Sequence, residues 1–467
     1  MIDDFINRSD CAFILERAIK GGAGFAELYF EDRDELSIKF NQNVKGITKT
    51  HIYGAGLYLI SGLQTVYSYT NDTSIESLKS LCDKSVKLLL QKQETKDNPT
   101  IPQFILKDIV DPNPVIEFPS SIQYQDKIKL LLEVNKACNG LYNEIINLDL
   151  TYFDTDQKVV IVNSRGLLAE DRRVTSRVRL FPTLTSPDDS ISYFTDFTRP
   201  AGFEVFKDGS YIGYAQKILK DMRENLYADT APGGVMPVIL EGGGCTGTFF
   251  HEACGHQFES QTIVNKGIFA DKIGTKVASD KVTLIDDGTM PNSYGSSKFD
   301  DEGNPRRKNI LIENGIMKSY LCDRIGALRL NTECTGSGRR QGYSFSPAAR
   351  MSNTYLDKGN DDPDEMISSL PSGLFVTKMG GGSGGEEFTL AAQTAFIVKN
   401  GKIDKQVKGA MLLGKGVETM QKIDRVGNTL IKEDGGGFCG SISGLLPTTT
   451  SGARMRVTEM LIGGKGA

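Results

Sequence analysis

Two hydrophobic patterns alternate along the first 230 residues. Where apolar side chains recur every three or four positions, they predict amphipathic helices. Where apolar and polar residues alternate, or β-branched and aromatic residues lie between Gly and Asn turns, they predict strands. The predicted helices are 11–20, Thr73–Gln93, Ser121–Cys138 and Ser210–Tyr227, and the predicted strands include Ala26–Phe30, Leu36–Phe40, Ala55–Ile60 and Thr65–Thr70. Helices mixed with antiparallel strands are an α+β pattern.

After residue 234 the pattern changes to short strands and turns. Val235–Leu240 is a continuous apolar run typical of a buried strand, and it leads into the glycine-rich stretch Glu241–Gly247. Asn314-Gly315 and Asn400-Gly401 each lie between apolar runs. Asn-Gly supplies the positive φ angles of a type I′ turn, so each pair predicts a tight hairpin. We therefore expect a β-rich C-terminal domain that carries one short motif helix.

Composition shifts divide the chain into parts. At 467 residues it is too long for a single hydrophobic core. Residues 94–120 are polar and proline-bearing, which indicates a linker, and Ala231–Gly234 is a second break. The pattern predicts an N-terminal α+β domain over 1–100, a middle α+β segment over 115–230 and the β-rich domain over 235–467.

The overall composition excludes several classes of protein. Net charge is −5 with a pI of about 5.5, which argues against nucleic acid as the main partner. No segment approaches the roughly 18 apolar residues of a membrane span, and the N-terminus has acids where a signal peptide has bases. The eight cysteines form no CxxC pair. A cytoplasmic, reducing location is expected, in which thiolates are available as ligands.

One short stretch concentrates the chemistry. His251-Glu252-Ala253-Cys254-Gly255-His256 holds two of the three histidines of the chain. Two imidazoles and a carboxylate this close together are typical of a hydrolytic metal site. The alternative is a pair of core histidines with polar partners. Because histidine is otherwise almost absent, we favour the metal site.

The spacing of the two histidines requires a distortion. Five residues on a regular helix correspond to a rotation of about 140°, so the two rings would diverge. One solution is a distortion at Gly255, for example a π-bulge, which realigns the rings and leaves Glu252 free as a general base. The other makes Glu252 and His256, four residues apart, the ligands. We favour the first because a glycine stands where the backbone must yield.

Zinc needs a third protein ligand and an open position for water. His51 lies in the first domain and is not expected to contribute. Glu259 follows His256 by three residues, and Cys254 lies inside the motif but can point into the core. Cys439 lies in a glycine-rich loop that would let the backbone approach a partner closely. We rank Cys439 modestly above Glu259 and leave the alternatives open.

The motifs around this stretch resemble those of the TldD/PmbA family, specifically its TldD branch. The resemblance covers essentially the whole chain in three parts. It rests on the His-Glu-x-x-x-His motif after a glycine-rich strand end and on Gly338-Arg339-Arg340, Arg350-Met351-Ser352-Asn353-Thr354, Gly416-Val417-Glu418-Thr419-Met420 and Phe438-Cys439-Gly440. One departure is Cys439-Gly440-Ser441, where we associate the branch with Cys-Gly-Lys. The departure leaves the cysteine in place and bears on local substrate contacts.

The resemblance implies a zinc-dependent peptidase with one catalytic ion. The family's metal ligands map to His251, His256 and Cys439, and its catalytic glutamate maps to Glu252. The PmbA branch lacks this metal motif and acts as a partner subunit. The resemblance therefore implies a homodimer or a heterodimer with a PmbA-type paralogue, and an enclosed cavity through which substrate is reached.

Two further features have competing interpretations. Arg339, Arg340 and Arg350 can bind a peptide carboxylate or polarise an oxyanion, and are about equally expected as surface or domain-interface arginines. Gly380–Gly385 lacks the Lys-Ser/Thr ending of a phosphate loop. It is interpreted as a flexible lid or a backbone wall beside the substrate, with a plain loop as the alternative.

The expected function is hydrolysis of peptide bonds in extended or unfolded peptides, with Glu252 as general base for zinc-bound water. The alternative is a non-catalytic, metal-containing subunit that binds peptides or regulates a partner. A third possibility is a metal-free scaffold.

Overall fold

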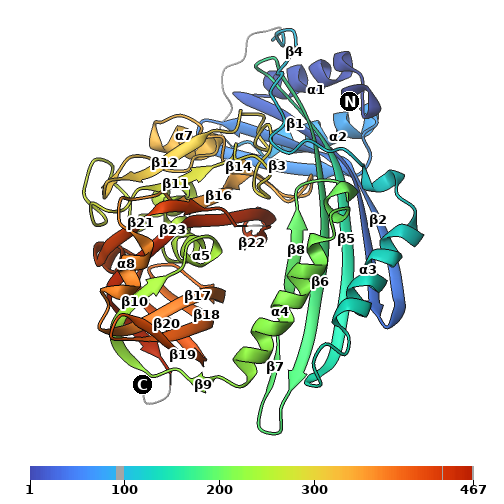
Figure 1. The fold of residues 1–467 in the computed structure, drawn as a ribbon. Helices are drawn as coiled ribbons and strands as arrows, with labels where there is room; N and C mark the ends of the chain where they lie inside the picture. The colour runs from blue at the N-terminus through green and yellow to red at the C-terminus, as the bar shows by residue number, and fades with distance from the viewer. Residues whose placement is uncertain (91–98, 434, 465–467) are drawn as a thin grey trace.

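The computed structural model describes residues 1–90, 99–433 and 435–464 (Figure 1). An eight-stranded sheet with helices forms the N-terminal half, and a larger β-rich part with short helices forms the C-terminal half. The predicted α+β class is confirmed. No helix among the described residues is both long and apolar enough to cross a membrane.

The N-terminal sheet has the order β3-β2-β1-β5-β6-β4, with β7 and β8 also paired to β6. Its strands are β1 (Phe25–Asn41), β2 (Asn43–Ser61), β3 (Gln64–Thr70), β4 (Ile105–Leu106), β5 (Ile145–Asn163), β6 (Leu167–Thr185), β7 (Ser190–Ser192) and β8 (Thr195–Arg199). Its helices are α1 (Arg8–Lys20), α2 (Ile75–Lys87), α3 (Tyr124–Cys138) and α4 (Ser210–Leu226).

All four predicted helices are present, with shifted ends. The predicted Thr73–Gln93 is α2, which begins after the N-cap Ser74 and ends at Lys87, and Gln93 itself lies outside the described residues. The two predicted strands Ala26–Phe30 and Leu36–Phe40 are one strand, β1, paired on both edges with β2 and β5. The polar residues between them are therefore strand residues.

Strand β1 joins the first two predicted parts. Because β1 pairs with β5 over most of its length, residues 1–100 and 115–230 contribute to one continuous sheet. Helices α1 and α2 pack near one end of the sheet, and α3 and α4 pack near its other end. The three-part domain division stays a prediction.

The two faces of β1 differ in chemistry. Positions such as Leu28 and Ile38 are apolar and lie under the helices. Positions on the opposite face, such as Glu27 and Glu31, are polar yet buried. Successive strand residues point to opposite faces, so these polar side chains lie on the face away from the helices. There they contact the C-terminal half, at Arg340 and Tyr343.

The C-terminal half contains a large sheet with the order β13-β12-β11-β16-β23-β10-β17-β18-β19-β9. Strand β20 pairs with both β18 and β23, so β23, β10, β17, β18 and β20 form a closed ring. The strands are β9 (Asp229–Thr230), β10 (Gly234–Leu240), β11 (Leu284–Asp287), β12 (Lys308–Glu313), β13 (Ile316–Met317), β16 (Asn353–Leu356), β17 (Ser372–Ser383), β18 (Glu387–Lys399), β19 (Lys402–Lys408), β20 (Ala410–Lys415), β21 (Ile423–Ile431), β22 (Gly437–Ser441) and β23 (Gly444–Gly463), with β14 (Gly338–Arg339) and β15 (Ala348–Ala349) in a separate pair.

Short helices pack against this sheet, and one of them, α5, carries His251 and Glu252. They are α5 (Gly244–Ala253), α6 (Ser260–Val264), α7 (Arg324–Leu330), α8 (Pro363–Ser368) and α9 (Gly416–Gln421). Both Asn-Gly hairpins are confirmed. Asn314 and Gly315 have φ of 49° and 79°, and Asn400 and Gly401 have φ of 52° and 72°. These are the positive values that a type I′ turn requires.

Charged pairs join the two halves. Arg340 donates to Glu27 of β1 at 2.8 Å, and Arg173 of β6 donates to Asp301 at 2.6 Å. Tyr29, from the same face of β1, packs with Phe299. A cavity of about 400 Å³ lies between the halves, lined by residues of β1, β5 and β6 on one side and by the C-terminal half on the other.

Candidate metal centre

Glycines allow α5 to begin directly after β10. Gly243 has φ of 77°, a value that other residues rarely adopt, and the backbone N–H of Gly244 donates to Glu433 Oε2 at 2.7 Å. A side chain on Gly247 would overlap the backbone of Ser451 in β23. The helix therefore lies against β16, β17 and β23, with Phe249 and Phe250 buried in the core.

The motif helix ends inside the motif. Helix α5 stops at Ala253, Cys254 adopts φ −150° and ψ −19°, and Gly255–Phe258 forms a 3₁₀ helix. The distortion is therefore a helix break at Cys254 and Gly255, not the π-bulge given as an example. A side chain on Gly255 would overlap the sulfur of Met351, which accounts for glycine at this position.

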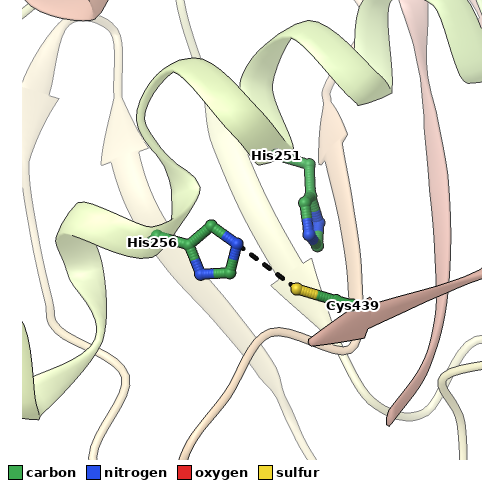
Figure 2. Close-up of side chains that lie close together, drawn as sticks. All are labelled: His251, His256 and Cys439. Atoms are coloured by element: carbon green, nitrogen blue, oxygen red, sulfur yellow. Dashed lines mark hydrogen bonds between the residues drawn. The ribbon is translucent and has the colours of Figure 1, made fainter. Parts of the chain in front are cut away.

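The break brings the two imidazoles together. The ring centroids of His251 and His256 are 5.1 Å apart and the rings are inclined by 83° (Figure 2). A continuous helix would direct side chains five residues apart in diverging directions. The change to a 3₁₀ turn redirects His256 toward the side on which His251 lies.

Cys439 completes the cluster from a distant strand. It lies on β22, opposite Leu446 of β23 in an antiparallel hairpin. Its Sγ is 3.3 Å from His256 Nε2, and Figure 2 shows His251 directed at the same sulfur. One potential ligand atom from each of His251, His256 and Cys439 lies within 4.8 Å of the others. Three segments of structure thus converge on one point.

Neighbouring side chains shift the pKa values of Cys439 and His256. Burial raises the pKa of the Cys439 thiol, but hydrogen bonds and positive charge from His251 and His256 outweigh burial and lower that pKa to about 5. Burial likewise lowers the pKa of His256, but its hydrogen bonds to Cys439 and Glu259 outweigh burial and raise it to about 10. Cys439 is therefore a thiolate at neutral pH, the form in which cysteine binds metal.

The donor set fits a metal ion. Two imidazoles and one thiolate are nitrogen and sulfur ligands of the kind that zinc prefers, and three protein ligands leave one position open. His251 Nδ1 is buried and has no hydrogen-bond partner among the described residues. A buried polar atom without a partner costs free energy, so an additional group at this site would stabilise it.

The other proposed ligands lie in different environments. Cys254 is fully buried and its thiol donates to the carbonyl oxygen of Phe250 within the core. Glu259 Oε1 is 3.2 Å from His256 Nδ1, on the opposite side of the ring from Cys439. His51 is exposed on β2, where its Nδ1 is 3.2 Å from Asp34.

Glu252 follows His251 on α5 and is not one of the three residues of the cluster. It is half-buried, and its carboxylate has no hydrogen bond or ion pair in the part of the chain that the structure describes. Its backbone is held closely, because a side chain on Gly384 would overlap the carbonyl oxygen of Glu252. Gly384 follows β17, so the Gly380–Gly385 segment is a strand end and turn that lies against the motif helix.

The three arginines are all buried. Arg339 donates to the carbonyl oxygens of Met351 and Pro447, and Arg340 forms the ion pair that joins the two halves. Arg339 and Arg340 also line the cavity between the halves. Arg350 donates to the carbonyl oxygen of Cys439 at 2.7 Å. Their role in substrate binding stays a prediction.

Sequence reasoning missed two neighbours of the site. Phe438 points away from Cys439 along β22 and lines the cavity, which alternation along a strand would have indicated. A side chain on Gly416, at the start of α9, would overlap the carbonyl oxygen of Ala253 at the end of α5. Nothing in the local sequence identifies the partner of that glycine.

Comparison with known proteins defines the class. Residues 26–89, 117–226 and 233–464 match domain 1, the central domain and the C-terminal domain described for the PmbA/TldA metallopeptidases. These matches place the chain in a metallopeptidase family. Two curated relatives are metalloprotease TldD homologs, from Buchnera aphidicola of Schizaphis graminum (31% identical, 98% of this chain and 96% of the relative) and from Haemophilus influenzae (31% identical, 94% and 93%). The chain belongs to the TldD/PmbA family.

Further relatives agree with this assignment. A zinc metalloprotease TldD homolog of Saccharolobus solfataricus is 26% identical over 73% of this chain and 76% of its own. Among solved structures, TldE of Thermococcus kodakarensis shares the fold with a TM-score of 0.73 and 16% identity, over 97% of this chain and 99% of TldE. A Thermotoga maritima protein has a TM-score of 0.76 and 17% identity, over 99% and 100%.

Proposed function

We propose that this chain is a zinc-dependent peptidase that hydrolyses extended or unfolded peptides. The observation that carries the proposal is the convergence of His251, His256 and Cys439 on one point, with Glu252 next to His251 in sequence on α5. The naming of one relative as a zinc metalloprotease supports the choice of metal. The nitrogen and sulfur donors support it independently, since oxygen-preferring ions such as Mg²⁺ bind such sites poorly.

His251, His256 and Cys439 would hold one zinc ion, which supplies Lewis-acid polarisation of a carbonyl group and lowers the pKa of water. Glu252 accepts a proton from the attacking water and donates it to the departing amine. A half-buried carboxylate without a protein partner suits that task because its lone pairs are available. Gly384 packs against the Glu252 carbonyl and limits movement of the base.

The cavity between the halves suits a peptide segment. Its volume is about 400 Å³, and Phe438, next to Cys439 in sequence, is part of its wall, whereas His251, Glu252, His256 and Cys439 are not among its lining residues. The lining combines aromatic side chains with arginines and carboxylates, which can pair with both backbone and side-chain groups of a peptide. We place Arg339 and Arg340 as candidates for contacts with the substrate.

The proposal extends to the partner subunit and to the cellular location. The fold shared with TldE supports assembly with a paralogue of that type, or with a second copy of this chain. All eight cysteines are unpaired, which supports a reducing compartment, the cytoplasm.

The test is Glu252→Gln. We expect the wild type to cleave unfolded peptides in a chelator-sensitive manner, alone or with a paralogue. The variant should keep stoichiometric zinc and lose activity by about 100-fold or more, because proton transfer by a positioned base contributes at least that factor. Glu418→Gln is the matched control, since Glu418 is an exposed glutamate on α9, and it should leave both activity and zinc unchanged.

Each other outcome has a defined meaning. Loss of zinc in Glu252→Gln would make Glu252 a ligand and refute its role as base. Zinc without cleavage of any unfolded peptide, even with the paralogue present, would favour a non-catalytic peptide-binding subunit. A wild type that binds no zinc would leave only a scaffold.

A further inference from the structure

One buried guanidinium contacts the strand hairpin that carries Cys439. Arg350 lies between β15 and β16 and is 1% exposed. Its Nη2 donates to the carbonyl oxygen of Cys439 at 2.7 Å, and its Nη1 donates to the Gly444 carbonyl oxygen at 3.1 Å and to Ser443 Oγ at 3.3 Å. The two nitrogens thus hold β22 at Cys439 and the turn that connects β22 to β23.

The same guanidinium reaches the motif segment through a carboxylate. Arg350 Nε is 3.5 Å from Glu259 Oε1, and that oxygen is 3.2 Å from His256 Nδ1. Glu259 is 2% exposed, and its other oxygen accepts from Gln261 at 2.9 Å. An ionised carboxylate only accepts hydrogen bonds, so it fixes the tautomer in which Nδ1 carries the proton. Nε2 is then the ring nitrogen that would give up its proton to a metal ion, and it lies 3.3 Å from the sulfur of Cys439.

We infer that Arg350 and Glu259 are positioning residues that hold His256 and Cys439 at ligating distance from a single metal ion. The inference rests on the proposed zinc site and deepens it. His256 and Cys439 are 183 residues apart, and Arg350 contacts both segments through its side chain. Groups that orient a metal ligand in this way raise metal affinity although they never touch the ion.

The geometry of the guanidinium group explains why arginine, and not lysine, is needed at position 350. Its planar guanidinium offers donors in several fixed directions. Here Nη1 and Nη2 donate to different partners, while Nε lies at ion-pair distance, 3.5 Å, from Glu259. A lysine keeps the charge but presents one ammonium, which cannot reach the carbonyl of Cys439, the Gly444 carbonyl and Glu259 together. Replacing arginine with lysine therefore separates geometry from charge.

The test measures zinc affinity by competition with a chelator. We expect Arg350→Lys and Glu259→Gln each to weaken zinc binding by about 10- to 100-fold, the range for groups that orient a metal ligand. The double variant should lose little more than either single variant, since the two residues act as one unit. Arg339→Lys is the matched control, because Arg339 is also a buried arginine with carbonyl partners but contacts neither Glu259 nor Cys439.

A second readout separates positioning from simple destabilisation. In cobalt-substituted protein, Arg350→Lys should change the thiolate-to-metal absorption, whereas Arg339→Lys should keep the wild-type spectrum. Melting temperatures of the metal-free variants identify any that fail to fold, and Glu259→Gln then carries the test.

Three results are decisive. Wild-type zinc affinity in both Arg350→Lys and Glu259→Gln, or an equal loss in Arg339→Lys, overturns the inference and leaves the proposed peptidase intact. Weakened zinc binding in a protein that cleaves no peptide supports the inference and refutes the peptidase. A wild type that binds no divalent metal overturns both.

Discussion

At the scale of single residues, the site depends on one thiolate that no local pattern supplies. Seven of the eight cysteines have a raised pKa because they are buried, and Cys439 alone has a lowered one. The difference is not burial, since Cys439 is buried as well. The two adjacent imidazoles cause it, so the same residue type is inert at seven positions and a potential ligand at the eighth.

Replacing this thiol tests its role directly. We expect Cys439→Ser to weaken zinc binding by at least about 100-fold, because losing a ligand costs more than losing a group that orients one. Cys254→Ser is the control, since that buried thiol bonds only to the Phe250 carbonyl. Zinc content after dialysis against a chelator is the measurement. Wild-type zinc retention in Cys439→Ser would show that Cys439 is not the third metal ligand and would leave Glu259 or Cys254 as the candidates.

At the scale of elements, the active geometry depends on where a helix stops. The five-residue spacing showed that a regular helix could not bring His251 and His256 together, and the break after Ala253 supplies the change of direction. Three glycines allow close packing around this break. Gly255 faces Met351, Gly384 faces the Glu252 carbonyl and Gly416 faces the Ala253 carbonyl.

Gly384→Ala should move Glu252. A Cβ at Gly384 would overlap the carbonyl oxygen of Glu252, so either the β17–β18 turn or the end of α5 must shift. We expect peptidase kcat to fall by about 100-fold, which a displacement of roughly 1 Å can cause, while zinc stays bound. Gly381→Ala is the control because Gly381 has open space around it. Unchanged kcat in Gly384→Ala would show that the turn yields and not the helix.

At the scale of the whole molecule, buried charges align the two halves. Glu27 and Asp301 each bind an arginine from the other half. Burying charges is costly unless they are paired, so these pairs favour one relative arrangement over others. The cavity between the halves depends on that arrangement, since both halves contribute to its wall.

Asp301→Asn tests this interface through its pH dependence. Burial raises the pKa of Asp301, but Arg173 and the backbone N–H of Arg340 outweigh burial and lower it below its ordinary value. A lowered folded-state pKa contributes stability that is present above the unfolded pKa of about 3.9 and lost as pH falls through the folded pKa. The variant should lack this part of the acid dependence and be less stable at neutral pH by about 3 kcal/mol, because Arg173 loses a buried partner.

The measurement is the free energy of unfolding by denaturant between pH 3 and 7, in steps of about one pH unit. Asp83→Asn removes an exposed carboxylate paired with Arg17 and is the control, since such surface pairs contribute little. A pH profile for Asp301→Asn parallel to that of the wild type would show that this pair does not stabilise the interface.

Sequence alone predicted the features that local chemistry determines. The Asn-Gly hairpins follow from the φ angles that those two residues accept. The division of β1 into two strands was wrong because Glu31 and Arg33 look like loop residues, yet each has a partner more than 300 residues away, at Tyr343 and Gln341. The family resemblance, and not spacing, identified Cys439. The form of the helix break depends on contacts with Met351 and Gly416 that no local pattern encodes.

The order of synthesis along the chain determines when the three candidate metal ligands can come together. The histidines leave the ribosome long before Cys439, and β22 is held in place by β23, which is later still. Strand β23 also closes the ring and pairs with β10, β16 and β21. An unfinished or truncated chain therefore offers two imidazoles without their thiolate. The three candidate ligands therefore cannot converge until the last strand has been made.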